Sequence, residues 1–222
     1  DVPVLASGVV RFVGEPIALV AAESEEIAQR ALELVGIEYE PLPGVFSPAA
    51  AMGPGAPIVH EPDNIVARQR IRKGDPEAGM AAADLIVENT FRMPFIEHAY
   101  LEPEAGVAWV DEQGVINIRT STQVIEHFRS IAMAVGVPQN KIRVQGAMLG
   151  GGFGGKEDIT VEIFLALLAK STRRPVRLAY TREESFMAHS KRHPFTITHR
   201  TGVKRDGRIT AAQIELTSDS GA

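Results

Sequence analysis

The chain has 222 residues, of which 45% are hydrophobic and 23% are charged, and its formal net charge at pH 7 is -5. This length suits one large domain or two small ones, and the composition is ordinary for a globular protein. The acidic balance lacks the basic footprint of a nucleic-acid binder, and no apolar run approaches the ~18 residues of a membrane span. Because the chain has no cysteine, disulfides and cysteine-ligated zinc or iron–sulfur clusters are excluded within it.

The first 62 residues predict a small α/β unit followed by a connector. β-rich segments at 9–13 and 16–22 precede a helix that begins after Ser24, and another strand is expected over 37–40. Six prolines between residues 41 and 62 exclude a continuous helix or strand there. We therefore place a domain boundary near residue 62, and we expect the chain to be a piece of a longer protein, cut at both ends.

The second part, residues 63–222, alternates predicted strands and helices, which indicates a mixed α/β (α+β) fold with mixed sheets. Its helices end at glycine and proline signals such as Gly136 and Pro138. The predicted strands are 64–73, 84–91, a hairpin of 106–110 with 114–120, 142–149, 175–180 and a hairpin of 194–204 with 208–218, and the predicted helices are 124–135, 157–170 and 182–189.

A glycine-rich loop, Gly150–Glu157, stands between a predicted strand and a predicted helix. Five of the six positions from 150 to 155 are glycine, so the backbone can adopt φ > 0 and a ligand can approach it closely. Amides without intrahelical acceptors at the start of the next helix favour an anionic or oxo-bearing ligand. The loop is therefore the first candidate binding site.

Alternative interpretations of this loop remain open. It fits the spacing of a phosphate-binding loop, but Glu157 occupies the place of the required Ser or Thr and would repel phosphate. Gly150, Gly152 and Gly155 fit a dinucleotide fingerprint, but the next strand ends in Tyr180-Thr181-Arg182, without the acidic residue that binds ribose. A tight strand-to-helix turn with no ligand is the third possibility.

Two other features carry polar side chains. The segment 97–104 holds Glu97, His98, Tyr100, Glu102 and Glu104, which predicts either an acid–base site or a buried polar corner. The side chain of Gln123 follows a strand, as the glycine loop does, so its amide is expected to join the loop amides in one donor-rich pocket. A helix N-cap is the other role open to Gln123.

Six motifs in a fixed order resemble the large, molybdenum-binding subunit of the xanthine dehydrogenase and aldehyde oxidase family. The resemblance covers essentially the whole chain and implies a truncated α/β hammerhead domain over 1–62 and the first part of a molybdopterin-binding domain over 63–222. The motifs are Val13–Ala21, Gly36–Pro43, Glu97–Pro103, Ser121–Gln123, Gly150–Glu157 and Arg192–Phe195.

The resemblance also implies roles for five residues. Gln123 is expected beside the molybdenum oxo ligand, and Gly152, Phe153 and Gly154 are expected to bind the cofactor, with the Phe153 amide near the metal. Glu157 is expected to contact a purine or another N-heterocycle, because aldehyde-oxidising members often have an apolar residue there. No side chain is expected to ligate the metal directly. The family's glutamate base lies beyond Ala222, so no catalytic residue is expected here.

The family reaction is hydroxylation with oxygen from water, after which electrons pass through iron–sulfur clusters, usually to a flavin. The resemblance therefore implies molybdenum–molybdopterin in the full protein, with iron–sulfur clusters and FAD on other segments or subunits. It implies a cytoplasmic oligomer whose partners are the rest of the large subunit, the iron–sulfur and flavin components and a small-molecule substrate, with no nucleic acid or membrane. The chain alone is expected to be inactive. A nucleotide-binding domain that uses Gly150–Gly155 and a non-catalytic scaffold are the alternatives.

Overall fold

The computed structural model describes residues 3–219, and the chain forms two compact units. The mixed-sheet unit contains the segment up to Tyr39 and the segment Glu97–Lys191. The ribbon unit contains Glu40–Ile96 and the segment that begins at Arg192. Among the described residues, no helix is long and apolar enough to cross a membrane.

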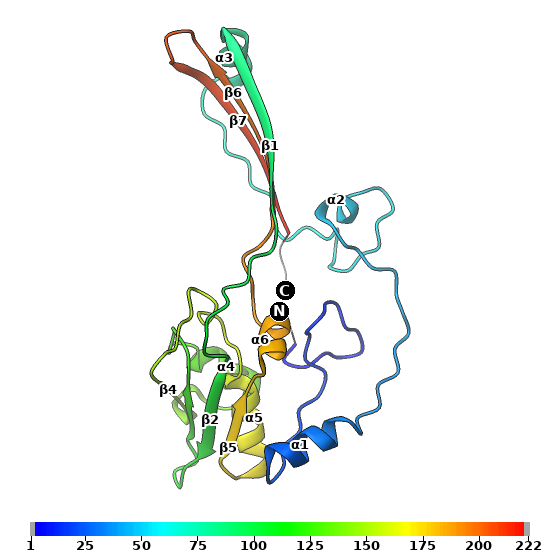
Figure 1. Cartoon of the computed structure of the whole chain (residues 1–222), viewed down its shortest axis with the longest axis vertical. Coiled ribbons are helices and arrows are strands. Elements are labelled where there is room, and N and C mark those ends of the chain that lie inside the picture. Colours follow the sequence, from blue (N-terminus) through cyan, green and yellow to red (C-terminus); the bar gives the residue numbers. More distant parts are fainter. Residues whose placement is uncertain (1–2, 220–222) are drawn as a thin grey trace. The chain divides into compact units, whose positions relative to one another are not determined.

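The mixed-sheet unit is built on a four-stranded sheet with the order β4-β3-β2-β5 (Figure 1). Its central hairpin of β2 and β3 forms as the sequence predicts. Asp111 stabilises the turn between the two strands, because it accepts hydrogen bonds from two amides of that turn. β3 pairs in parallel with β4, while β2 pairs antiparallel with both β3 and β5. The strands are β2 (Ala105–Val110), β3 (Ile116–Thr120), β4 (Ile142–Gly146) and β5 (Val176–Ala179).

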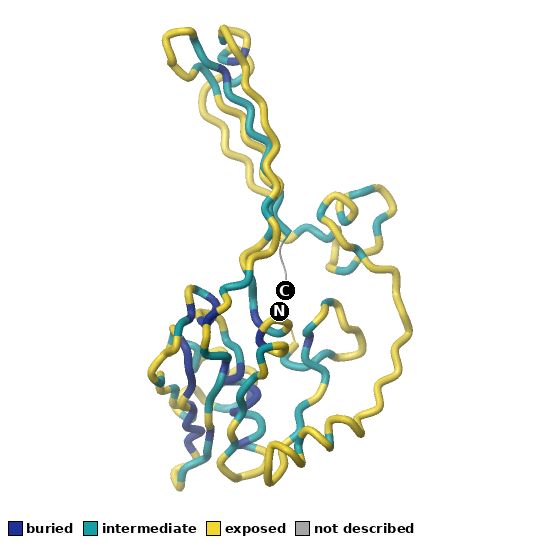
Figure 2. The backbone as a smooth tube through the Cα atoms, viewed as in Figure 1, coloured by how far each residue is buried: buried dark blue, intermediate teal, exposed yellow. Residues whose placement is uncertain are grey.

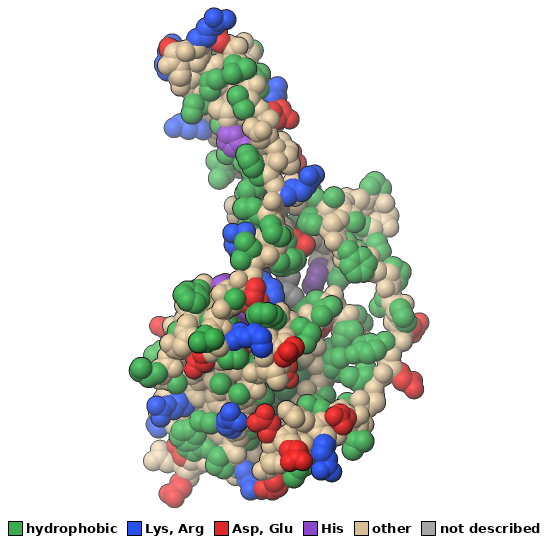
Figure 3. Space-filling view, in the orientation of Figure 1, with side chains coloured by type: hydrophobic (Ala, Val, Ile, Leu, Met, Phe, Trp, Pro, Cys, Tyr) green, Lys and Arg blue, Asp and Glu red, His purple; other side chains and the backbone are tan. Residues whose placement is uncertain are grey.

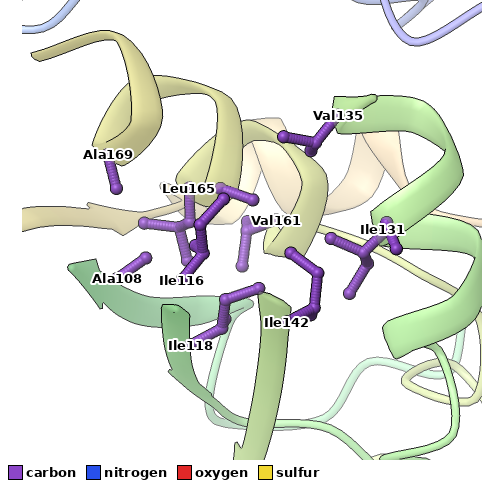
Figure 4. Close-up of a cluster of buried hydrophobic side chains, with 11 residues drawn as sticks. Ala108, Ile116, Ile118, Ile131, Val135, Ile142, Val161, Leu165 and Ala169 are labelled. Carbon is purple, nitrogen blue, oxygen red and sulfur yellow. The ribbon is translucent and has the colours of Figure 1, made fainter. Parts of the chain in front are cut away.

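The core of this unit lies between the sheet and two helices, α4 (Phe128–Val135) and α5 (Glu162–Thr172) (Figure 4). Ile118 on β3, Ile131 on α4 and Leu165 on α5 have no exposed surface. Burying each such side chain contributes roughly 1.5–3 kcal/mol. The labelled residues of Figure 4 point toward one another from the sheet and both helices. This packing holds β3 and β4 in place, and with them the segments that follow these strands.

The N-terminal segment keeps one predicted element and lacks three. α1 (Glu25–Leu32) begins after its N-cap Ser24, as predicted, but none of its residues is buried. The strands expected over 9–13, 16–22 and 37–40 do not form, and an isolated bridge between Ser7 and Val9 is the β-structure there. A β-prone segment becomes a strand only when another strand pairs with it, and these segments find no pairing partner among the described residues.

The ribbon unit is a three-stranded antiparallel sheet with the order β1-β6-β7. The predicted hairpin of its last two strands is confirmed, whereas the strand expected over 64–73 does not form. Much of the ribbon is exposed, and hydrophobic side chains reach its surface (Figures 2 and 3). Its elements are α2 (Pro48–Ala51), α3 (Pro76–Ala81), β1 (Leu85–Met93), β6 (Phe195–Val203) and β7 (Ile209–Ser218).

The two units together confirm the mixed α/β class, with one mixed sheet and one antiparallel sheet. Two short helical elements complete the mixed-sheet unit. These are the 3-10 turn η1 (Gln139–Lys141) and α6 (Arg182–Ala188).

Candidate functional site

The glycine loop and Gln123 lie at one edge of the mixed sheet, as the sequence predicts. β3 and β4 run in parallel with Thr120 opposite Gly146, so both strands end at the same edge. Gln123 follows β3, and the loop that contains Gly150–Glu157 follows β4. The ends of neighbouring parallel strands are where ligands bind in α/β sheets.

Gln123 holds the loop in place through its side-chain oxygen. Its Oε1 accepts hydrogen bonds from the backbone amides of Gly154 at 3.0 Å and Lys156 at 3.3 Å. The backbone amide of Gln123 donates to the Lys156 carbonyl at 2.9 Å. Two donors at one atom identify that atom as the oxygen, so Nε2 faces away from them. The N-cap alternative for Gln123 is wrong, because α4 begins at Phe128 without a side-chain cap.

An ion pair between a buried lysine and a half-buried glutamate, which the sequence did not predict, fixes the other side of the loop. Glu102 Oε2 accepts hydrogen bonds from the Gly150 amide at 2.7 Å and from Lys156 Nζ at 3.0 Å. The Lys156 side chain has no exposed surface, and its ammonium lies 4.6 Å from the centre of the Tyr100 ring. Burial raises the pKa of Glu102, but the Gly150 amide and the Lys156 ammonium outweigh it and hold that pKa below its ordinary value.

Close packing against the protein's own side chains explains three of the loop glycines. A Cβ on Gly152 would lie 2.3 Å from Gln123 Oε1, and one on Gly155 would lie 2.7 Å from Tyr100 Cε1. A Cβ on Gly150 would lie 2.6 Å from the Cβ of Glu102. Gly150 and Gly152 therefore let Glu102 and Gln123 reach the loop backbone, and Gly155 makes room for the Tyr100 ring.

The loop keeps hydrogen-bond donors that the chain itself does not use. Within the part of the chain that the structure describes, the amides of Gly151, Gly152 and Phe153 and the Nε2 of Gln123 have no acceptor. Phe153 adopts φ 53°, an uncommon conformation for a residue with a bulky side chain, and its side chain is 76% exposed. Successive amides in such a turn form a concavity that binds anions or oxo groups.

Glu157 lies just beyond the loop and is exposed. Among residues 3–219, no ion-pair partner meets its carboxylate, while its carbonyl accepts a hydrogen bond from His127 Nε2. The predicted helix from 157 is wrong at its start, because α5 begins at Glu162. Glu162 accepts hydrogen bonds from the Thr160 amide and hydroxyl, so a turn intervenes. The positive end of the α5 dipole therefore does not adjoin the loop amides, in contrast to the prediction.

The segment 97–104 forms a buried polar corner. The Tyr100 hydroxyl donates to Glu104, and both side chains are essentially buried. Burial first, and then the Glu104 carboxylate, raises the pKa of the Tyr100 hydroxyl. Burial lowers the pKa of His189, against the opposing effect of Glu104 and Glu97. His189, for which the sequence predicted no role, joins this corner from the end of α6.

The topology rules out the dinucleotide fingerprint. That fingerprint requires the strand after the helix to lie beside the first strand of the unit and parallel to it. Here the strand after α5 is β5, which pairs with β2 and is separated from β4 by β3 and β2. The glycine loop therefore belongs to a different kind of site.

Comparisons with known proteins match this fold. Residues 59–222 match the molybdopterin cofactor-binding domain, and residues 1–43 match the hammerhead domain of aldehyde oxidase and xanthine dehydrogenase. The chain is 39% identical over its whole length to 52% of the nicotinate dehydrogenase large molybdopterin subunit of Eubacterium barkeri. It is 40% identical, again over its whole length, to 30% of a probable xanthine dehydrogenase subunit of Bacillus subtilis.

A solved structure agrees with this assignment. The aldehyde oxidoreductase from Desulfovibrio desulfuricans superposes with a TM-score of 0.93 and 28% identity, over 97% of this chain and 24% of that one. The fold and site thus define a stretch of a molybdopterin-binding subunit. The chain belongs to the xanthine dehydrogenase and aldehyde oxidase family, and it spans about half or less of the length of these relatives.

Proposed function

We propose that this chain forms the oxo-facing wall of the molybdenum–molybdopterin pocket in a hydroxylase. The observation that carries the proposal is the set of unpaired donors at Gly151–Phe153, beside Gln123 Nε2. An oxo- and phosphate-bearing pterin cofactor supplies acceptors, so the donors fit this group. Donors that are already held in place need no reorganisation when charge develops on the ligand.

Each proposed cofactor residue has a separate task. Gln123 would donate through Nε2, since its oxygen is committed to the loop. The amides of Gly152 and Phe153 would donate beside it. The Gly154 amide already binds Gln123, so Gly154 would instead shape the loop, because its φ of 95° is a conformation that favours glycine. When bound, the molybdenum cofactor supplies the two-electron redox chemistry. The chain's own residues orient the cofactor.

The proposed substrate is a nitrogen heterocycle, recognised by Glu157. Its carboxylate is exposed and lies directly after the donor face of the loop. A carboxylate accepts hydrogen bonds from ring N–H groups, whereas an aldehyde carbonyl has no donor to offer. Two relatives, a nicotinate dehydrogenase subunit and a probable xanthine dehydrogenase subunit, are named for heterocycles and support this class of substrate. The glutamate base, iron–sulfur clusters and FAD would belong to other segments or subunits.

We also propose the boundary near residue 62, with the hammerhead portion before it. The two family matches, over 1–43 and 59–222, lie on either side of the proline-rich connector and support that division. Several relatives are named as subunits, and the partners of this protein would be iron–sulfur and flavin components in a cytoplasmic oligomer. Copurification of a tagged complex from the cytosolic fraction would test these assignments.

The deciding experiment uses the whole protein that contains this chain, purified with its natural partners. Molybdenum and pterin content are measured first, and turnover is then compared for xanthine, nicotinate and an aldehyde. We expect stoichiometric molybdenum, with Gln123→Ala lowering kcat. Glu157→Gln should lower kcat/KM for the heterocycle by about 10–100-fold, equivalent to roughly 1–3 kcal/mol, and leave aldehyde turnover unchanged.

Glu183→Gln is the matched control, because Glu183 is an exposed carboxylate on α6 of the same unit. It should leave both kinetic constants unchanged. Molybdenum with turnover of the aldehyde alone would retain the cofactor proposal and reject the heterocycle. A folded, complete protein without molybdenum would reject the cofactor proposal and leave the scaffold alternative.

A further inference from the structure

Three side chains behind the glycine loop are arranged like metal ligands. Glu97, His98 and His189 each offer one ligand atom, and these atoms lie within 4.8 Å of one another. Glu97 and His98 precede the polar corner in sequence, whereas His189 ends α6. The His189 side chain has no exposed surface, and the Glu97 side chain is 22% exposed. The group is therefore shielded and drawn from two distant segments.

Polar atoms of all three residues are buried without a hydrogen-bond partner among the described residues. They are His189 Nε2, His98 Nδ1 and Glu97 Oε2. Buried polar atoms in proteins are normally paired, because an unpaired one loses its hydration and gains nothing in return. Glu97 Oε2 meets Lys191 Nζ in an ion pair, and Glu97 Oε1 accepts a hydrogen bond from the Ala99 amide, so the two imidazole nitrogens are the atoms that indicate a missing partner.

The orientation of the His189 ring points to a cation. Its Nδ1 lies 3.1 Å from the carbonyl oxygen of Ser190, which can only accept, so Nδ1 carries the hydrogen of that contact. Its Nε2 lies 2.8 Å from Glu97 Oε1 without the alignment of a hydrogen bond. Histidines that bind metals commonly donate their second ring nitrogen to a backbone carbonyl, which fixes the tautomer. His189 has this arrangement.

The surrounding charges also favour a cation. The carboxylates of Glu97, Glu102 and Glu104 outnumber the ammonium groups of Lys156 and Lys191. Lys191 Nζ lies 3.5 Å from Glu97 Oε2, so it only partly neutralises that carboxylate, and Oε1 is the oxygen that faces His189. These three carboxylates and two ammonium groups sum to a formal charge of -1, which attracts a cation.

We propose that Glu97, His98 and His189 bind a divalent transition-metal ion, with Zn²⁺ as the best match. Two imidazoles and one carboxylate are a common zinc ligand set, and a water molecule can complete four-coordination. Mg²⁺ and Ca²⁺ prefer oxygen ligands and fit this set poorly. The ion ties the segment before Tyr100 to the end of α6. His98 packs closely against Gly155, since a Cβ added there would lie 2.9 Å from His98 Nδ1. An ion that holds His98 in place would therefore also hold the glycine loop in place.

The test is direct titration of the full chain, freed of metal with a chelator, with ZnCl₂ by calorimetry. We expect one ion per chain, with affinity falling at least about tenfold in His189→Gln and in His98→Gln. His193→Gln is the matched control, since His193 is an exposed histidine outside the group. It should bind as the wild type does. This readout is independent of the molybdenum cofactor, so the proposed function can fail without affecting it.

Co²⁺ substitution supplies a second readout, because the visible spectrum reports the ligands around the ion. The wild-type chain should show the bands of a four-coordinate nitrogen and oxygen site, and Glu97→Gln should lose or shift them while circular dichroism shows a folded chain. No stoichiometric Zn²⁺ binding by the wild type overturns the proposal. Equal binding by a folded His189→Gln also overturns it. If the histidine variants fail to fold, unchanged Co²⁺ bands in Glu97→Gln have the same consequence.

Discussion

The two units of this chain use apolar side chains in opposite ways. In the mixed-sheet unit, Ile118 and Leu165 have no exposed surface, because α4 and α5 cover the sheet. In the ribbon unit, Leu85 and Ile214 are 59% and 58% exposed, and Met80 of α3 is the buried hydrophobic residue there. Side-chain packing therefore stabilises the first unit, whereas backbone pairing along the full length of β1 and β6 holds the second.

The largest expected difference between the units comes from removing a leucine in each. Leu165→Ala should lower the free energy of unfolding by about 2–5 kcal/mol, because it leaves a cavity in a core that cannot fully collapse. Urea unfolding followed by the fluorescence of Trp109, the single tryptophan, reports this unit directly, since Trp109 lies on β2.

The matched change in the ribbon is Leu216→Ala, at a leucine that is 55% exposed on β7. It should change stability by no more than about 0.5 kcal/mol, as surface substitutions usually do. Hydrogen exchange of the ribbon amides measures it. A loss as large as that of Leu165→Ala would mean that the ribbon has a side-chain core of its own, and the comparison would fail.

The next contrast concerns ion pairs. Glu102→Ala leaves the Lys156 ammonium, whose side chain has no exposed surface, without its carboxylate, and we expect a loss of about 1–3 kcal/mol, the cost of a buried group left without its partner. Lys204→Met removes the ribbon pair with Asp84, whose side chains are 34% and 39% exposed. That change should cost about 0–1 kcal/mol. Thermal unfolding of both variants beside the wild type gives the comparison, and equal shifts would contradict it.

The smallest effect is a pH dependence. Because the folded-state pKa of Glu102 lies below its ordinary value of 4.5, the ionised form stabilises the fold above that pH. This stabilisation is lost as the pH falls through the lowered pKa. The stability of Glu102→Gln, followed by Trp109 fluorescence from pH 7 to pH 3, should therefore fall less steeply than that of the wild type.

Asp84 of the ribbon is the corresponding control. Hydrogen bonds from the Arg205 amide and from Lys204 also lower its pKa, and its partner Lys204 is partly exposed to solvent, unlike Lys156. Asp84→Asn should change the acid dependence less than Glu102→Gln does. A wild type and Glu102→Gln with parallel acid profiles would show that the Lys156 pair adds nothing to stability.

The sequence predicted elements well where the signals are local. The hairpin around Asp111 and the hairpin of β6 and β7 combine alternating side chains with a turn, and both form. The strands expected over 9–22 and 64–73 fail because a strand also needs a neighbour, which no local pattern supplies. Helix starts were misplaced at 124 and 157. Gln123 bonds to the glycine loop before α4, and Glu162 bonds to Thr160 before α5, so both helices begin later than predicted.

The candidate site was predictable in its position but not in its supports. Gln123 and the glycine loop both follow strands, and this pattern alone was enough to predict that they lie together. The Lys156–Glu102 pair joins residues 54 positions apart, and nothing in the local sequence links them. His189 was missed for the same reason, since its partners Glu97 and His98 lie close to it in space but far from it in the sequence.

The anchoring of the glycine loop decides which of its backbone amides are paired and which are not. The oxygens of Gln123 and Glu102 accept hydrogen bonds from the amides of Gly150, Gly154 and Lys156, so the amides of Gly151, Gly152 and Phe153 stay available. The anchoring thereby decides the sign of charge that the backbone itself attracts: the positive ends of these N–H bonds attract lone pairs and repel cations. An acceptor for a ligand's N–H group must come from a side chain instead, and Glu157 is the carboxylate that follows the loop.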